Sequence, residues 1–108
     1  MTVRRGEIWY ADVPGDKRRP VVVLTRDSVL PRLTTILVAP VTTRVRSIPT
    51  EVPVTGLPRA CVANLDNIHV VAKQQIGARA GVLAARREVE VKRALGYALG
   101  WPELKVLE

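Results

Sequence analysis

Apolar and polar residues alternate over short segments along most of this chain, which is typical of β-strands. Pro, Gly, Asn and Asp residues separate the segments and predict turns between them. The predicted strands cover residues 6–13, 21–25, 34–41, 51–54, 60–63, 68–72 and 75–80. The chain up to residue 80 is therefore predicted to be nearly all β.

Residues 21–24 are a run of four large apolar side chains in the second predicted strand. Because side chains alternate between the faces of a strand, both faces should be covered, one by the core and the other by a neighbour. Pro20 lacks an N–H donor and favours an extended residue before it, which fits a strand start and places Arg19 at a sheet or barrel rim. The short connection through residues 16–19 predicts an antiparallel hairpin with a charged tip.

The periodicity changes to a helical one over residues 84–99. Val91, Ala94, Leu95, Ala98 and Leu99 fall on one face of this predicted helix, opposite charged residues. Gly100 and then Pro102 are typical of a helix end. Short strands followed by one C-terminal helix predict a small, curled antiparallel sheet or open barrel in a single domain over residues 1–108.

Composition narrows the class of protein. The 108 residues carry a formal net charge of +7, which favours a polyanionic partner such as nucleic acid or an acidic protein. One cysteine, Cys61, and one histidine, His69, cannot build a four-ligand zinc site, and a lone cysteine fits a reducing cytosol. Apolar runs such as residues 36–39 fall far short of the roughly 18 residues of a membrane helix. We therefore expect a soluble cytoplasmic protein without a metal.

The positive charge is concentrated in one third of the chain. Residues 13–46 contain two acids and seven cations, a net +5: Lys17, Arg18, Arg19, Arg26, Arg32, Arg44 and Arg46. If the first hairpin tip and the basic segment 44–49, which we expect to be mobile, lie on one rim, they form a groove for a phosphate backbone. A solvated basic face is the alternative, and it fits Arg26 and Arg32 equally well.

The acids of the chain are scattered, without the clustered carboxylates of a two-metal nuclease. RNA can also be cut by its own 2′-OH, which needs a proton acceptor, a proton donor and cations near the phosphate. Arg19, Thr42, Arg44, Asp66 and His69 provide suitable groups. An arginine side chain stays protonated at neutral pH and is therefore a poor proton carrier. Arg19 is therefore given an electrostatic role, and the base is left unassigned.

Each candidate also has a structural interpretation. Arg19 could form an ion pair with Asp12 or Asp16. Thr42 could be an ordinary turn hydroxyl, Asp66 a turn former and His69 a strand residue. Packing is the alternative to base stacking for Trp9 and Trp101.

Three segments carry a family resemblance: 4–10 (Arg-Arg-Gly-Glu-Ile-Trp-Tyr), 19–24 (Arg-Pro-Val-Val-Val-Leu) and 38–43 (Val-Ala-Pro-Val-Thr-Thr). Together they resemble the MazF/PemK/Kid family of toxin–antitoxin endoribonucleases, over nearly the full chain. The resemblance implies an SH3-like barrel that dimerises, cleaves single-stranded RNA at short sequences without a metal or other cofactor, and is neutralised by an acidic MazE-like antitoxin. The apolar strand at residues 21–24 agrees with dimerisation.

By position, the resemblance implies that Arg19, Thr42 and Asp66 are catalytic. The basic residues Lys17, Arg18, Arg44 and Arg46 are the predicted RNA-binding residues. Two other functions remain open. One is a CcdB-like toxin that poisons DNA gyrase without nuclease activity, which the pairing of Gly100 with Trp101 resembles. The other is a non-catalytic RNA-binding barrel. The cleaved RNA class and motif, and the roles of His69 and Trp101, stay open.

Overall fold

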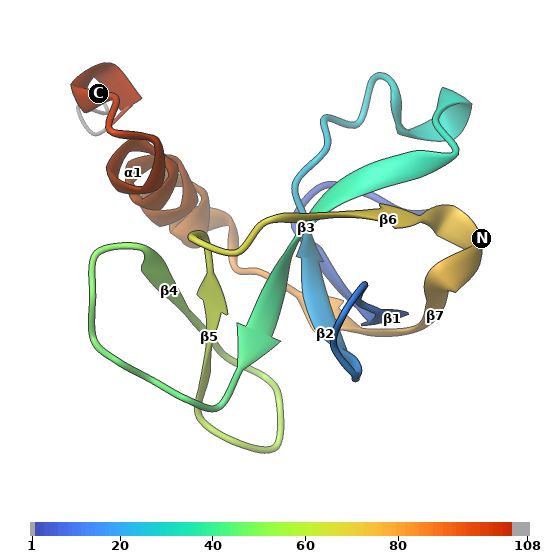
Figure 1. Cartoon of the computed structure of the whole chain (residues 1–108), viewed down its shortest axis with the longest axis horizontal. Coiled ribbons are helices and arrows are strands. Elements are labelled where there is room, and N and C mark those ends of the chain that lie inside the picture. The colour runs from blue at the N-terminus through green and yellow to red at the C-terminus, as the bar shows by residue number, and fades with distance from the viewer. Residues whose placement is uncertain (1, 105–108) are drawn as a thin grey trace.

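The computed structural model describes residues 2–104, which form seven strands, one α-helix and four short 3-10 helices (Figure 1). The strands are β1 (Glu7–Asp12), β2 (Arg18–Val23), β3 (Thr35–Thr42), β4 (Glu51–Val54), β5 (Cys61–Asn64), β6 (His69–Ala72) and β7 (Ile76–Val82). The helix is α1 (Glu88–Leu99). None of the helices in this part of the chain has the length and apolar character needed to cross a membrane.

All strand pairs are antiparallel, in the order β4-β5-β3-β2-β1-β7. One edge of β3 is shared: its first half pairs with β6, and its last residues, Val41 and Thr42, pair with β5. The long strand β3 therefore connects two parts of a strongly curled sheet, with α1 beside β4 and β5 (Figure 1). The predicted curled antiparallel sheet with a C-terminal helix is confirmed.

Strand β2 separates two apolar clusters. Val21 and Val23 belong to one cluster with Trp9, while Val22 belongs to the other with Ala94 of α1. All three valines of β2 are at most 1% exposed. The chain thus covers both faces of this strand by itself, and the expectation that one face needs a neighbouring molecule was wrong. These residues give no reason for dimerisation.

Two elements, β2 and α1, begin three or more residues away from the predicted start. β2 begins at Arg18, and Pro20 lies inside it, where the strand pairs with β1 but not yet with β3, so a missing N–H is tolerated. Helix α1 begins at Glu88 after a 3-10 turn. It ends as predicted at Gly100, whose φ of 69° is left-handed. Leu99, expected on the apolar face, is 53% exposed at the last helical position.

Candidate active site

The ends of β2 and β3 bring the first two candidate residues together. The ladder between these strands pairs Val23 with Val38 and Val21 with Pro40. The ladder ends there, but continuing its register by two residues leads to Arg19 on β2 and Thr42 on β3, and both residues line the same cavity. Side chains two residues apart share a face of a strand, so Arg19 and Thr42 lie on the same side of the sheet.

A polar cavity of about 230 Å³ lies at this position. Its lining residues, which define the Arg19 pocket, are Asp16, Arg19, Pro40, Thr42, Arg44, Arg46, Asn64 and Asn67. They come from the first hairpin, the end of β3, the loop after β3 and the end of β5. The structure therefore brings together four predicted site residues that lie up to 27 positions apart in the chain (Arg19 to Arg46).

Arg19 forms an ion pair inside the pocket. Its Nε lies 2.9 Å from Asp16 Oδ2, and its Nη2 donates a hydrogen bond to Asp16 Oδ1 at 3.1 Å. Nη1 is 3.5 Å from the carbonyl oxygen of Val41. The side chain is only 19% exposed, so the guanidinium is held at the wall of the pocket. The predicted alternative pairing with Asp16 is confirmed, whereas Asp12 pairs with another residue.

The pocket holds Asp16 as an anion. The backbone N–H of Lys17, which donates to Asp16 Oδ1 at 2.7 Å, is the largest cause that lowers the pKa of this carboxyl below its usual value. Burial opposes this effect and raises the pKa, and the hydrogen bond and the charge of Arg19 lower it again, so that the net shift is downward. Asp16 is therefore ionised at neutral pH.

Thr42 is both a turn residue and a pocket residue. Its Oγ1 accepts a hydrogen bond from the backbone N–H of Arg44 at 3.1 Å. That bond uses the hydroxyl as an acceptor, and the hydroxyl proton stays available as a donor. Thr42 can thus donate to a group bound in the pocket while it fixes the start of the basic loop.

The loop after β3 was expected to be mobile, but several hydrogen bonds fix it. Oε1 of Glu51 accepts the backbone N–H of both Arg46 and Ser47 at 2.9 Å. Ser47 has a φ of 58°, an uncommon conformation for a residue other than glycine. Glu51 and Thr42 hold the two ends of the loop segment that carries Arg44 and Arg46, so these arginines line the pocket from an ordered backbone.

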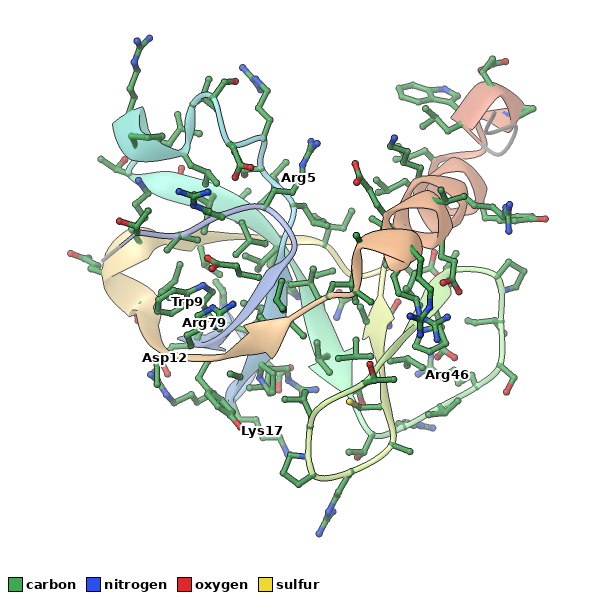
Figure 2. The ribbon with its side chains drawn as sticks, turned by 180° about the vertical axis from the view of Figure 1, so that it is seen from behind. Arg5, Trp9, Asp12, Lys17, Arg46 and Arg79 are labelled. Carbon is green, nitrogen blue, oxygen red and sulfur yellow. The ribbon has the colours of Figure 1, made fainter. Side chains whose placement is uncertain are left out.

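Three other candidate residues, Lys17, Arg18 and His69, lie outside the Arg19 pocket. Figure 2 labels Lys17 at the tip of the first hairpin, and its side chain does not line the Arg19 pocket. Arg18 is on the opposite face of β2 from Arg19 and pairs with Asp12 at 3.0 Å. His69 begins β6, opposite Val38, and is also outside the pocket.

Asp66 is turned away from the pocket. Its Oδ2 accepts a hydrogen bond from Thr50 Oγ1 at 2.6 Å, and its backbone N–H donates to Asn64 Oδ1 at 2.9 Å. These contacts close the turn between β5 and β6, which matches the structural interpretation of Asp66 as a turn former. The carboxylate that reaches Arg19 is Asp16 instead.

The pocket also contains four residues that were not predicted as site residues: Asp16, Pro40, Asn64 and Asn67. Asn64 and Asn67 had been interpreted only as turn formers, yet both line the Arg19 pocket. Their amide groups offer donors and acceptors that suit the edges of nucleic-acid bases. The missing signal is the pairing of β5 with β3, which places Ala63 opposite Val41 and so brings the next residue, Asn64, to the pocket.

A larger cavity, about 630 Å³, lies between α1 and strands β2 and β7. Its walls are mainly apolar, and its charged residues, Arg5, Asp27, Glu88 and Lys92, are of both signs. Because these charges balance, the cavity has no excess positive charge for a phosphate backbone. The smaller Arg19 pocket, with three arginines and one carboxylate, is the better candidate site.

Comparison with known proteins gives a family match over residues 4–99, described as PemK-like, MazF-like toxin of type II toxin–antitoxin system. The protein named endoribonuclease MazF3 from Mycobacterium tuberculosis (strain CDC 1551 / Oshkosh) is 43% identical over 91 residues. That alignment covers 80% of this chain and 88% of the relative.

Two solved structures share the fold. The Mycobacterium tuberculosis toxin MazF-mt6 is 39% identical, with a TM-score of 0.82 over 87% of this chain and 96% of the other. A mycobacterial endoribonuclease in complex with its cognate antitoxin is 26% identical, with a TM-score of 0.81 over 93% and 97% of the two chains. The curled sheet and the polar pocket at its edge thus occur in a chain that resembles both proteins over most of its length.

Proposed function

The chain belongs to the family of PemK-like, MazF-like toxins of type II toxin–antitoxin systems, and we propose that it cleaves single-stranded RNA without a metal ion, through attack of a ribose 2′-OH on the adjacent phosphate. It is an endoribonuclease toxin, and its partner is an antitoxin. The 2′-OH mechanism, the single-stranded substrate and the residue roles below are our proposals.

The reaction needs a proton acceptor for the 2′-OH, a proton donor for the 5′-oxygen and groups that stabilise the negative charge on the phosphate. The 2′-oxygen loses its proton and bonds to phosphorus, while the 5′-oxygen leaves and takes up a proton. The products are a 2′,3′-cyclic phosphate and a 5′-OH. Negative charge accumulates on the phosphoryl oxygens in the transition state, and groups that already point at those oxygens lower the barrier.

Arg19 and Thr42 are the groups we assign to that charge. The guanidinium of Arg19 is held at the pocket wall by Asp16, and the Thr42 hydroxyl can donate a hydrogen bond from the neighbouring strand. The observation that supports this assignment best is that both residues line the same pocket, at the ends of two paired strands. Arg44 and Arg46 contact the flanking phosphates from the ordered loop.

We place the protein in the cytoplasm, as a homodimer bound by an acidic antitoxin. Exposed apolar side chains such as Leu37, Val70 and Val82, which are 46%, 56% and 55% exposed, would be suitable contacts for a second copy. Charge complementarity between a basic pocket rim and an acidic segment favours association and can block RNA entry.

The function is tested with end-labelled RNA in excess EDTA, beside an oligonucleotide of the same sequence with 2′-deoxy sugars throughout. We expect the RNA to be cut to fragments that end in 2′,3′-cyclic phosphate and 5′-OH, and the 2′-deoxy strand to stay intact. Loss of cutting in EDTA, or cutting of the 2′-deoxy strand, would contradict the proposal.

The same experiment separates the alternatives. Binding of RNA without cutting would indicate a non-catalytic barrel, and inhibition of DNA gyrase without cutting would indicate a gyrase poison. The Gly100 and Trp101 pairing that resembles the gyrase poisons has a structural explanation here, because Gly100 ends α1 in a left-handed conformation. The structure gives no separate support for that function.

The basic loop makes a second prediction about binding. Arg44→Ala and Arg46→Ala should each weaken binding of the non-cleavable 2′-deoxy strand and reduce the slope of log Kd against log salt by about 0.7, the value for one lost phosphate contact on a single strand. Fluorescence anisotropy over a range of NaCl concentrations measures both effects.

Arg79→Ala is the matched control for charge. Arg79, on β7, pairs with Glu7 at 3.1 Å and lies beside Trp9 of β1, away from the pocket (Figure 2). The Arg79→Ala substitution removes the same charge but should leave the slope unchanged. Equal slopes for all three variants would mean that only net charge matters, and that the loop does not contact phosphates.

A further inference from the structure

Asp16 is the single carboxylate among the residues that line the Arg19 pocket. Its contacts with Arg19 involve the side edge of the guanidinium, formed by Nε and Nη2. A guanidinium has five N–H donors in a rigid plane. The side edge faces Asp16, and Nη1 donates one hydrogen bond to the carbonyl oxygen of Val41. The second N–H of Nη1 and the second N–H of Nη2 are left for two oxygens of one phosphate.

The first hairpin fixes Asp16 in this orientation. Its backbone N–H donates to the carbonyl oxygen of Val13 at 3.0 Å, and its Oδ1 accepts the backbone N–H of Lys17 at 2.7 Å. Gly15 beside it has a φ of 73°, a conformation that glycine adopts without strain. The connection between β1 and β2 is only five residues long (13–17), so the carboxylate has little freedom to move away from Arg19.

We propose that Asp16 is a positioning residue for RNA cleavage, which binds the side edge of the Arg19 guanidinium and aims its end at the scissile phosphate. This inference rests on the proposed function of the pocket. Asp16 acts through Arg19 and exchanges no proton with the RNA. An ionised carboxylate with a lowered pKa is a weak base, which is consistent with this role.

A positioning role has a specific kinetic consequence. A misplacement of about 1 Å in a catalytic group can cost about 10²-fold in rate. We therefore expect Asp16→Asn, which keeps the shape and can still accept the Lys17 N–H, to lower kcat about 10-fold to 10²-fold and to change KM much less. Asp16→Glu, which retains a carboxylate, should recover part of the lost kcat.

Asp12→Asn is the matched control. Asp12 lies on the same hairpin and pairs with Arg18 on the opposite face of β2, so the substitution removes the same charge and one ion pair without touching the pocket. Its kcat should equal that of the wild type. Combining Asp16→Asn with Arg19→Ala should give the kcat of Arg19→Ala alone, because Asp16 has no effect without the guanidinium.

Several outcomes would overturn this inference. If Asp16→Asn leaves kcat unchanged and lowers KM, Asp16 competes with the phosphate for Arg19. If Asp16→Asn lowers kcat further in the Arg19→Ala background, Asp16 contacts the RNA directly. A loss of kcat in Asp12→Asn as large as in Asp16→Asn would indicate a general charge effect. Wild-type protein that cuts no RNA would instead reject the proposed function itself.

Discussion

Arg19→Ala should lower the rate of RNA cleavage by about 10²-fold or more while the protein folds normally. The reason is that Arg19 is assigned to the negative charge that develops on phosphorus, and one such contact in a transition state is worth about 10²-fold to 10³-fold. The side chain is near the start of β2 and outside both apolar clusters, so its loss does not open the core. Single-turnover cleavage of end-labelled RNA measures the rate, and urea unfolding measures the stability.

Arg18→Ala is the comparison for this variant, because it removes the same charge from the next residue of β2. Arg18 points to the other face and pairs with Asp12, so its loss should act only through RNA binding, as a higher KM with kcat retained. Arg19→Lys should remain nearly as slow as Arg19→Ala, since an ammonium cannot bind Asp16 and a phosphate with a planar fork. Equal rates for the Arg18 and Arg19 variants would contradict the assignment.

The strands of this fold could be predicted well from alternation alone. The bounds of β4 were predicted without error as residues 51–54, and β1 was predicted within one residue at each end. Alternation reports which side chains can be buried together, and this signal is local. The β2 start was placed three residues too late, because the apolar run begins at Val21 while pairing with β1 already begins at Arg18.

The order of the strands could not be predicted in the same way. β5 pairs with the end of β3 and β6 with its beginning, and the paired residues lie 20 to 37 positions apart in the chain. The alternation of apolar and polar residues describes each strand by itself and does not show which distant strands pair. As a result Asn64 was predicted in a turn, although it is the last residue of β5, and the presence of Asn64 and Asn67 in the pocket was missed.

The residues of the candidate site also differ in how well the sequence predicts them. Arg19 and Thr42 follow from a hairpin and a neighbouring strand, and the family resemblance pointed to both. The sequence pointed to Asp66 as the site carboxylate, but the direction of a side chain in a tight turn does not follow from sequence position. In the structure the Asp66 carboxylate accepts a hydrogen bond from Thr50, and the carboxylate that contacts Arg19 is that of Asp16.

Thr42→Val should lower kcat for RNA cleavage by about 10²-fold. Valine keeps the shape of threonine but removes the hydroxyl, so the phosphate loses the hydrogen-bond donor that β3 provides in the pocket. The hydroxyl also accepts the backbone N–H of Arg44, and its loss loosens the start of the basic loop. A higher KM should therefore accompany the fall in kcat.

Two further variants test whether the effect of Thr42→Val comes from the lost hydroxyl. Thr42→Ser keeps the hydroxyl and should retain most of the wild-type kcat. Thr43→Val makes the same chemical change at the next residue, which is exposed and outside the pocket, and should leave kcat unchanged. If Thr42→Val cuts RNA at the wild-type rate, the threonine only shapes the turn. In that case Arg19 stabilises the phosphate without a hydroxyl donor from β3, and the proposed mechanism loses one of its two assigned groups.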